Sequence, residues 1–127
     1  MPLDMLWNTK YFRASGLYKG DGYMEFSING INWTMEYADS DKDFLNDGDN
    51  TILGLTKFLE QTIYIRKRMS KELTRRTVIH ELCHCFLFSL GFSMDCYTEE
   101  TMCDLFGNYA DHIVGLADDF EKEVIEC

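Results

Sequence analysis

Five consecutive residues in this chain have side chains whose types and spacing could hold a metal ion: His80-Glu81-Leu82-Cys83-His84. If the segment is helical, His80 and His84 share one face, about 5–6 Å apart, so their imidazoles can bind one ion together. Zinc accepts imidazole nitrogen readily, and a catalytic zinc site keeps one position open for water. Glu81 is rotated about 100° around the helix, which brings its carboxylate near that water. The pattern therefore predicts a metal-activated water with Glu81 as general base and then general acid.

The segment around the motif is apolar on nearly every side, which predicts a buried helix. A buried helix that carries two histidines and a glutamate must supply partners for them. A pair of core histidines with ordinary hydrogen bonds is the alternative, and we consider it the weaker one. Cys83 and Cys85 point away from the face of His80 and His84, so we expect them to be small apolar core residues. We expect the same of Cys103.

The elements that must position the motif can be read along the chain. Ser70 is a good N-cap for a helix over 71–90 that stops at Gly91, and Thr98 can cap a second helix over 99–126. Asn29-Gly30 between alternating apolar residues predicts a β-hairpin. The remaining expected strands are 53–58 and 62–66.

A third metal ligand must come from elsewhere in the chain, because two histidines do not complete a zinc site. The second helix can fold back across the first, since only the short stretch 91–97 separates them. In a simple helical hairpin Asp104 lies closest to His84, so geometry leaves the choice of carboxylate open. Glu100 and Asp104 are four residues apart, so one can bind the metal while the other orients a ligand histidine. The candidates are His112, Glu99, Glu100, Asp104 and Asp111.

The motif followed by Glu100-x-x-x-Asp104 resembles the gluzincin arrangement of zinc metallopeptidases. Among these it is most similar to the small phage and bacterial ImmA/IrrE-type and SprT-like minimal zincins, over residues 53–111. The resemblance implies that Glu100 is the third zinc ligand and that Asp104 is a carboxylate near a ligand histidine. It also implies that the strand before the first helix pairs with an extended peptide substrate. A regulatory cleavage of one protein partner in a phage-like setting would fit this family.

Composition limits the function classes. The chain has 22 acidic and 12 basic residues and a net charge of −10, which argues against nucleic acid as the main partner. No secretory signal and no membrane-length apolar run is visible, and the odd set of five cysteines favours reduced thiols, so we expect a cytoplasmic protein without a membrane partner.

The acidic stretch 39–50 lacks EF-hand spacing and is expected to be a solvated loop. The basic cluster within 66–76 is expected to compensate the acidic remainder.

Together these patterns predict an N-terminal arm over 1–22 and a single zincin-like domain over 23–127. The expected fold class is α+β, with a small, mainly antiparallel sheet packed on two long helices and one Zn²⁺ between the helices. The expected function is a zinc-dependent metallopeptidase acting on a peptide or protein substrate. Two alternatives remain: a non-enzymatic zinc-containing module that binds protein through an acidic surface, and a metal-dependent hydrolase of a non-peptide amide. A second donor to the reacting carbonyl oxygen could be any of Tyr64, Tyr97, Tyr109 and His112.

Overall fold

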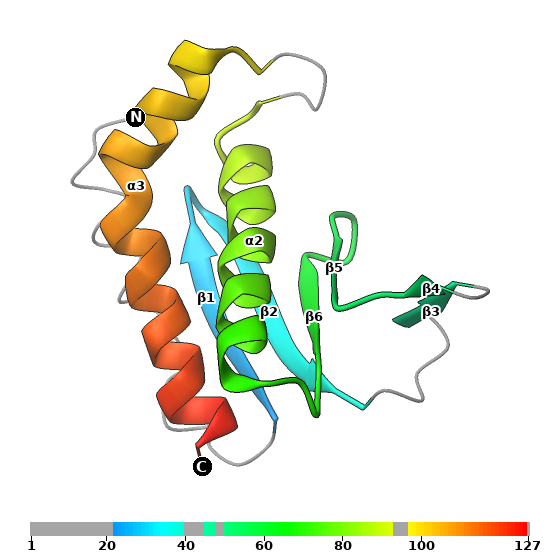
Figure 1. Cartoon of the computed structure of the whole chain (residues 1–127). Coiled ribbons are helices and arrows are strands. Elements are labelled where there is room, and N and C mark those ends of the chain that lie inside the picture. Colours follow the sequence, from blue (N-terminus) through cyan, green and yellow to red (C-terminus); the bar gives the residue numbers. More distant parts are fainter. Residues whose placement is uncertain (1–21, 40–44, 48–49, 93–96, 127) are drawn as a thin grey trace.

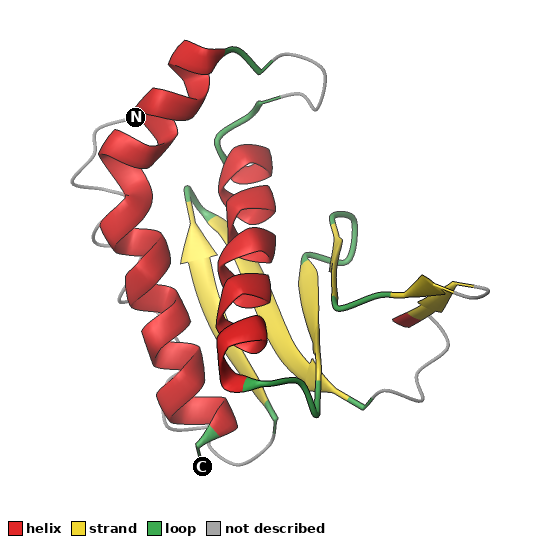
Figure 2. Cartoon of the chain, viewed as in Figure 1, coloured by secondary structure: helices red, strands yellow, loops and turns green. Residues whose placement is uncertain are grey.

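The computed structural model describes residues 22–39, 45–47, 50–92 and 97–126 (Figure 1). These residues form a four-stranded sheet, a separate two-stranded ribbon and two helices, so the fold class is α+β (Figure 2). Nearly all of the predicted arm 1–22 and most of the acidic stretch 39–50 lie outside the described residues. The elements are β1 (Tyr23–Ile28), β2 (Ile31–Ala38), β3 (Asn46–Asp47), β4 (Asn50–Thr51), β5 (Gly54–Lys57), β6 (Thr62–Arg66), α2 (Lys71–Ser89), α3 (Glu99–Phe120) and a π-helical turn, η2 (Glu121–Ile125).

The main sheet has the strand order β1-β2-β6-β5. β1 and β2 form the hairpin expected from Asn29-Gly30, where both turn residues have positive φ angles (51° and 81°) that suit asparagine and glycine. The outer pair β5–β6 is also antiparallel, but the central pair β2–β6 is parallel, so the expectation of a mainly antiparallel sheet is corrected to a mixed one. A parallel neighbour requires a long connection, and the segment from Asp39 to Gln61 supplies it.

The position of β6 overturns one implication of the family resemblance. β6 directly precedes α2, but it pairs with β2 on one side and with β5 on the other. Its backbone groups are therefore occupied within the sheet, and it cannot add a substrate strand. In the described part of the chain, the unpaired edge nearest α2 belongs to β5, which pairs with β6 alone.

Both helices cover the same face of the sheet, with α2 over the strands and α3 alongside α2 (Figure 1). Ser70 caps α2 as expected, because its hydroxyl accepts a hydrogen bond from the backbone N–H of Leu73 at 3.1 Å. α2 ends one residue before Leu90, and Gly91 (φ 87°) allows the N–H of Phe92 to reach the carbonyl of Leu87. None of the helices in the described ranges combines the length and the apolar character needed to cross a membrane.

The core lies between the sheet and the two helices. Trp33 on β2 is buried and donates from its indole nitrogen to the hydroxyl of Ser89 at 2.8 Å, which fixes the end of α2 over the sheet. At the opposite end, Tyr37 packs edge-on against Phe120 of α3.

The basic cluster compensates acidic groups as expected, through ion pairs from Lys67 and Arg68 to Asp39, from Lys71 to Glu121 and from Arg75 to Asp118 and Glu121.

Candidate metal centre

The helix α2 brings His80 and His84 together. Their ring centroids lie 5.0 Å apart with the planes at 76°, as the spacing of four residues predicts. The side chain of His80 is 67% exposed, whereas His84 is half-buried. The pair is therefore open to solvent on one side, which leaves room for an ion and a water.

Glu81 occupies a protected position next to this pair. The residue is only 7% exposed, and its Oε1 accepts a hydrogen bond of 2.7 Å from the hydroxyl of Thr56 on β5. Its Oε2 lies 3.9 Å from Nε2 of His80. The carboxylate is thus held by the sheet through one oxygen while the other lies near the imidazole of His80.

The close approach of β5 to α2 depends on Gly54. A Cβ atom at this position would lie 2.6 Å from Cγ2 of Thr77, 3.0 Å from Cγ of Glu81 and 3.3 Å from its Oε2. The hydroxyl of Thr77 is bonded to the carbonyl of Leu73 at 2.8 Å, which limits how far that side chain can yield. Sequence reasoning missed both Gly54 and Thr56, and only the placement of a glycine two residues before a threonine on an expected strand could have indicated them.

Aromatic side chains lie near His84, the second histidine of the motif. The ring of Phe58, directly after β5, meets the ring of His84 edge-on with centroids 6.3 Å apart. It also lies 5.0 Å from the ring of Phe88, which is 40% exposed. His84 therefore borders an apolar surface that remains accessible at Phe88.

The structure does not bring the carboxylates of α3 to this site. Glu100 and Asp104 lie exposed on the first turns of α3. In the described ranges, no group of three or more His, Cys, Asp or Glu side chains is placed to hold a metal ion. The roles of Glu100 as third ligand and of Asp104 beside a histidine therefore stay predictions.

The contacts between α2 and α3 show where the second helix approaches. Phe86 packs against Tyr109 and His112, with ring centroids 5.8 and 5.0 Å apart. Phe86 lies six residues after His80, which places it about 120° away around the helix. α3 thus approaches a different face of α2 from the one that carries the motif. Asp104 lies beside the C-terminal end of α2, where it lines a hollow of about 270 Å³ with Leu90 and Phe92.

Two of the candidate donors to a reacting carbonyl oxygen are placed away from Glu81. Tyr64 alternates along β6 with Ile63 and Ile65, which are fully buried beneath α2, so its side chain lies on the opposite face of the sheet. His112 is buried against Phe86. Tyr64 and His112 are therefore placed as structural residues, and the identity of the second donor stays open. Tyr109 is half-buried, with a pKa raised by burial, and Tyr97 is 38% exposed just before α3.

The cysteines near the motif behave as apolar residues. Cys85 is fully buried, and burial, followed by the charges of Glu81 and Cys83, raises the pKa of its thiol well above the ordinary value. Burial also raises the pKa of Cys83. Cys85 belongs to the buried core and Cys83 packs against it, as expected of small apolar residues. Cys103 was expected in the core but is exposed, because the buried stripe of α3 runs through other positions such as Leu105 and Leu116.

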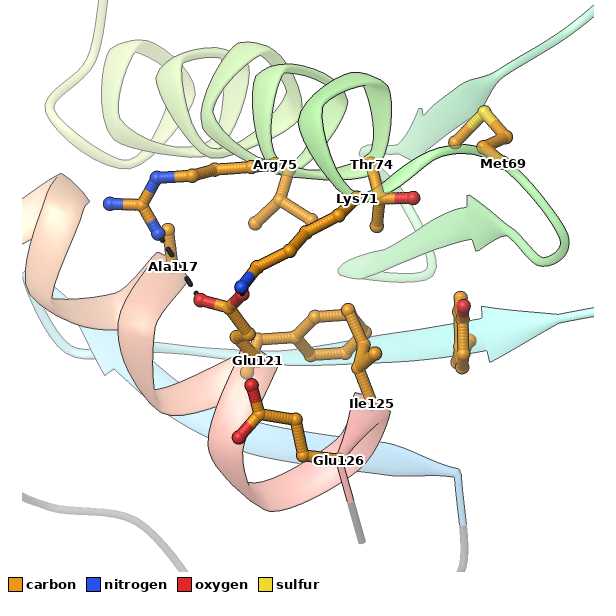
Figure 3. Close-up of a pocket in the computed structure, with 11 residues that line it drawn as sticks. Met69, Lys71, Thr74, Arg75, Ala117, Glu121, Ile125 and Glu126 are labelled. Atoms are coloured by element: carbon orange, nitrogen blue, oxygen red, sulfur yellow. Dashed lines mark ion pairs between the residues drawn. The ribbon is translucent and has the colours of Figure 1, made fainter.

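A second hollow, of about 260 Å³, lies at the other end of α2 (Figure 3). Its apolar wall includes Val78 and Phe120, and the side chains of Lys71 and Arg75 extend over it toward Glu121 (Figure 3). Both cations lie 3.6 Å from a carboxylate oxygen of Glu121. Because these charges compensate one another, we assign no ligand to this hollow.

No significant match to the chain is found among protein-family models, curated proteins or solved structures. Membership of the zincins therefore stays a prediction, which rests on the residues of the motif and on the resemblance described above. The described geometry adds an adjacent pair of imidazoles and a buried carboxylate aimed at one of them.

Proposed function

We propose that this chain is a zinc-dependent metallopeptidase in which His80 and His84 bind the ion and Glu81 is the general base. The observation that carries the proposal is the placement of Glu81: a buried carboxylate with one oxygen 3.9 Å from Nε2 of His80. A site that used zinc only for stability would need no carboxylate held in this way beside its ligands.

The side chains present fit zinc. Two imidazoles 5.0 Å apart are suitable nitrogen donors, and the exposed flank of His80 leaves space for further ligands. The third protein ligand in this proposal is Glu100, as the family resemblance implies, with Asp104 orienting a ligand histidine. This assignment requires the first turns of α3 to approach the pair when the ion is bound.

Each residue has a defined part in the proposed hydrolysis. Zinc, when bound, would lower the pKa of a water molecule and polarise the carbonyl of the bond to be cleaved. Glu81 accepts a proton from the water that attacks the carbonyl carbon. As the carbon–nitrogen bond breaks, Glu81 delivers that proton to the departing amine nitrogen. The products are an amine and a carboxylic acid, whose own proton passes to the amine or to solvent, and Glu81 returns to its starting state.

We further propose that an extended peptide substrate pairs with the free edge of β5. Strand addition to a sheet edge orients a peptide through main-chain hydrogen bonds. A strand beside Gly54–Lys57 would run past Thr56, which contacts Glu81, and toward Phe58, which follows β5 and contacts His84. The accessible ring of Phe88 next to His84 would favour an apolar side chain close to the cleaved bond.

The proposal can be tested with a peptide library incubated with zinc-loaded protein, followed by mass spectrometry of the products. We expect cleavage at peptide bonds flanked by apolar residues, and none with Glu81→Gln, whose amide cannot accept the proton. The variant should retain its zinc and its fold. A protein that binds zinc but cleaves no peptide would favour the zinc-containing binding module or a non-peptide amide as substrate.

A further inference from the structure

The side chain of Thr56 contacts the carboxylate that the proposed mechanism depends on. Thr56 is 9% exposed and lies on β5 directly across from Ile63, so it faces α2. Its hydroxyl donates to Oε1 of Glu81 at 2.7 Å and lies 3.5 Å from the backbone carbonyl of the same residue. A hydrogen bond to an ionised carboxylate in a buried setting is among the stronger polar contacts in proteins.

This contact distinguishes the two oxygens of the carboxylate. Oε1 is occupied by Thr56, while Oε2 is directed toward Nε2 of His80. A glutamate side chain has several rotatable bonds, and it loses that freedom when one oxygen is fixed. The hydroxyl of Thr56 therefore sets which oxygen is available to take up a proton next to His80.

Gly54 makes the contact possible. It lies two residues before Thr56, so both positions face α2. A side chain there would meet Thr77 and Glu81 at distances of 2.6 and 3.0 Å, which would push β5 away from the helix or displace the carboxylate. The glycine and the threonine together form a cradle for Glu81 on the edge strand.

We infer that Thr56 is a positioning residue for the general base, acting through Glu81 rather than on substrate. The inference rests on the proposed function and goes beyond it by assigning to β5 a part in catalysis besides substrate pairing. It also explains why a polar side chain is buried between the sheet and the helix at this point.

The first test compares steady-state kinetics of Thr56→Val, Thr56→Ser and wild type. Thr62→Val on β6 is a matched control, because the hydroxyl of Thr62 donates to the turn carbonyl of Glu60. Since misplacing a catalytic group can cost about 100-fold, we expect Thr56→Val to lower kcat by roughly 10- to 100-fold. KM and zinc content should be unchanged, because Thr56 touches neither histidine. Thr56→Ser keeps the donor and should recover most of kcat, and Thr62→Val should match wild type.

A second readout needs neither zinc nor activity. In chelator-treated protein, urea midpoints are measured for Thr56→Val, for Glu81→Ala and for the double variant. If the two side chains are bonded, the midpoint shift caused by Thr56→Val will shrink or reverse once Glu81 is absent. This cycle also shows whether each variant folds.

The outcomes separate this inference from the proposed function. Active wild type with an equally active Thr56→Val, a Thr56→Ser as impaired as Thr56→Val, or additive midpoint shifts would each overturn the role of Thr56 alone. A folded, zinc-loaded wild type that cleaves no peptide would instead overturn the proposed function, and with it the catalytic meaning of the contact.

Discussion

Oε2 of Glu81 and Nε2 of His80 lie 3.9 Å apart. The two residues are neighbours in the chain, but the side chain of His80 is 67% exposed and that of Glu81 is 9% exposed. The carboxylate of Glu81 is held against β5, because its Oε1 accepts a hydrogen bond from the hydroxyl of Thr56. The imidazole remains mostly in solvent, whereas the carboxylate is buried. A carboxylate and an imidazole nitrogen thus lie close together while differing in their contact with water. In the proposed mechanism these groups are the general base and a zinc ligand.

The first prediction concerns the third zinc ligand. Glu99 and Glu100 are adjacent exposed carboxylates on the first turn of α3, so Glu99→Gln is a matched control for Glu100→Gln. We expect Glu100→Gln to weaken zinc binding by at least about tenfold, since even partners that only orient a ligand have effects of that size. Glu99→Gln should bind zinc as wild type does. Competition with a chromogenic chelator measures both affinities, and equal affinities would exclude Glu100 as a ligand.

If Glu100→Gln has no effect, the same assay identifies the carboxylate that replaces it. Asp104→Asn and Asp111→Asn change the remaining candidate carboxylates on α3 with almost no change in side-chain size. Loss of zinc affinity in one of these variants would move the third ligand along the helix. Loss in none of them would leave His112 as the remaining candidate on α3.

The second prediction concerns the space at Gly54. Gly54→Ala places a methyl group against Thr77 and Glu81, and overpacking of this kind costs about 1–3 kcal/mol of unfolding free energy. Gly107→Ala is the control: it lies on α3 with nothing within 4 Å of an added Cβ, and alanine in an exposed helix should stabilise by about 0.5–1 kcal/mol. Neither glycine has a positive φ angle, so both substitutions suit the backbone. Urea denaturation measures both effects, and a neutral Gly54→Ala would contradict the close packing of β5 on α2.

The third prediction concerns pH. The pKa of Tyr64 is raised by burial and by the charges of Glu36 and Glu60, and its hydroxyl lies 3.3 Å from Oε1 of Glu60. The folded state thus favours the neutral phenol, so this contribution to stability is complete below the pKa of the unfolded phenol, about 10. It is lost as the pH rises through the higher pKa of the folded state. We expect a shallower loss of unfolding free energy above pH ~10 in Tyr64→Phe than in wild type, as followed by urea denaturation. Identical slopes would contradict the raised pKa.

Local signals in the sequence account for much of the fold. Asn29-Gly30 predicted the hairpin, and Ser70 predicted the start of α2, because each acts through the backbone within a few residues. The parallel pairing of β2 with β6 was missed, since it depends on a long connection rather than on any local pattern. The edge position of β5 follows from that pairing and was missed with it.

In the candidate site, too, local features could be predicted from the sequence and long-range contacts could not. The proximity of His80 and His84 follows from helical geometry alone, so the sequence was sufficient to predict it. The bond from Thr56 to Glu81 joins residues 25 apart and depends on how a sheet edge packs on a helix, which no local spacing encodes. The place of Glu100 depends on how α3 approaches α2, and the described contacts of Phe86 show that approach on another face of the helix.

The central claim is that the pair of histidines on α2 binds a catalytic zinc. The most direct measurement is elemental analysis of the purified protein together with Glu81→Gln and His84→Ala, each dialysed against zinc and then against buffer. We predict near-stoichiometric zinc in the wild type and in Glu81→Gln, and its loss in a folded His84→Ala. Absence of zinc from the wild type, or full retention in His84→Ala, would contradict the account.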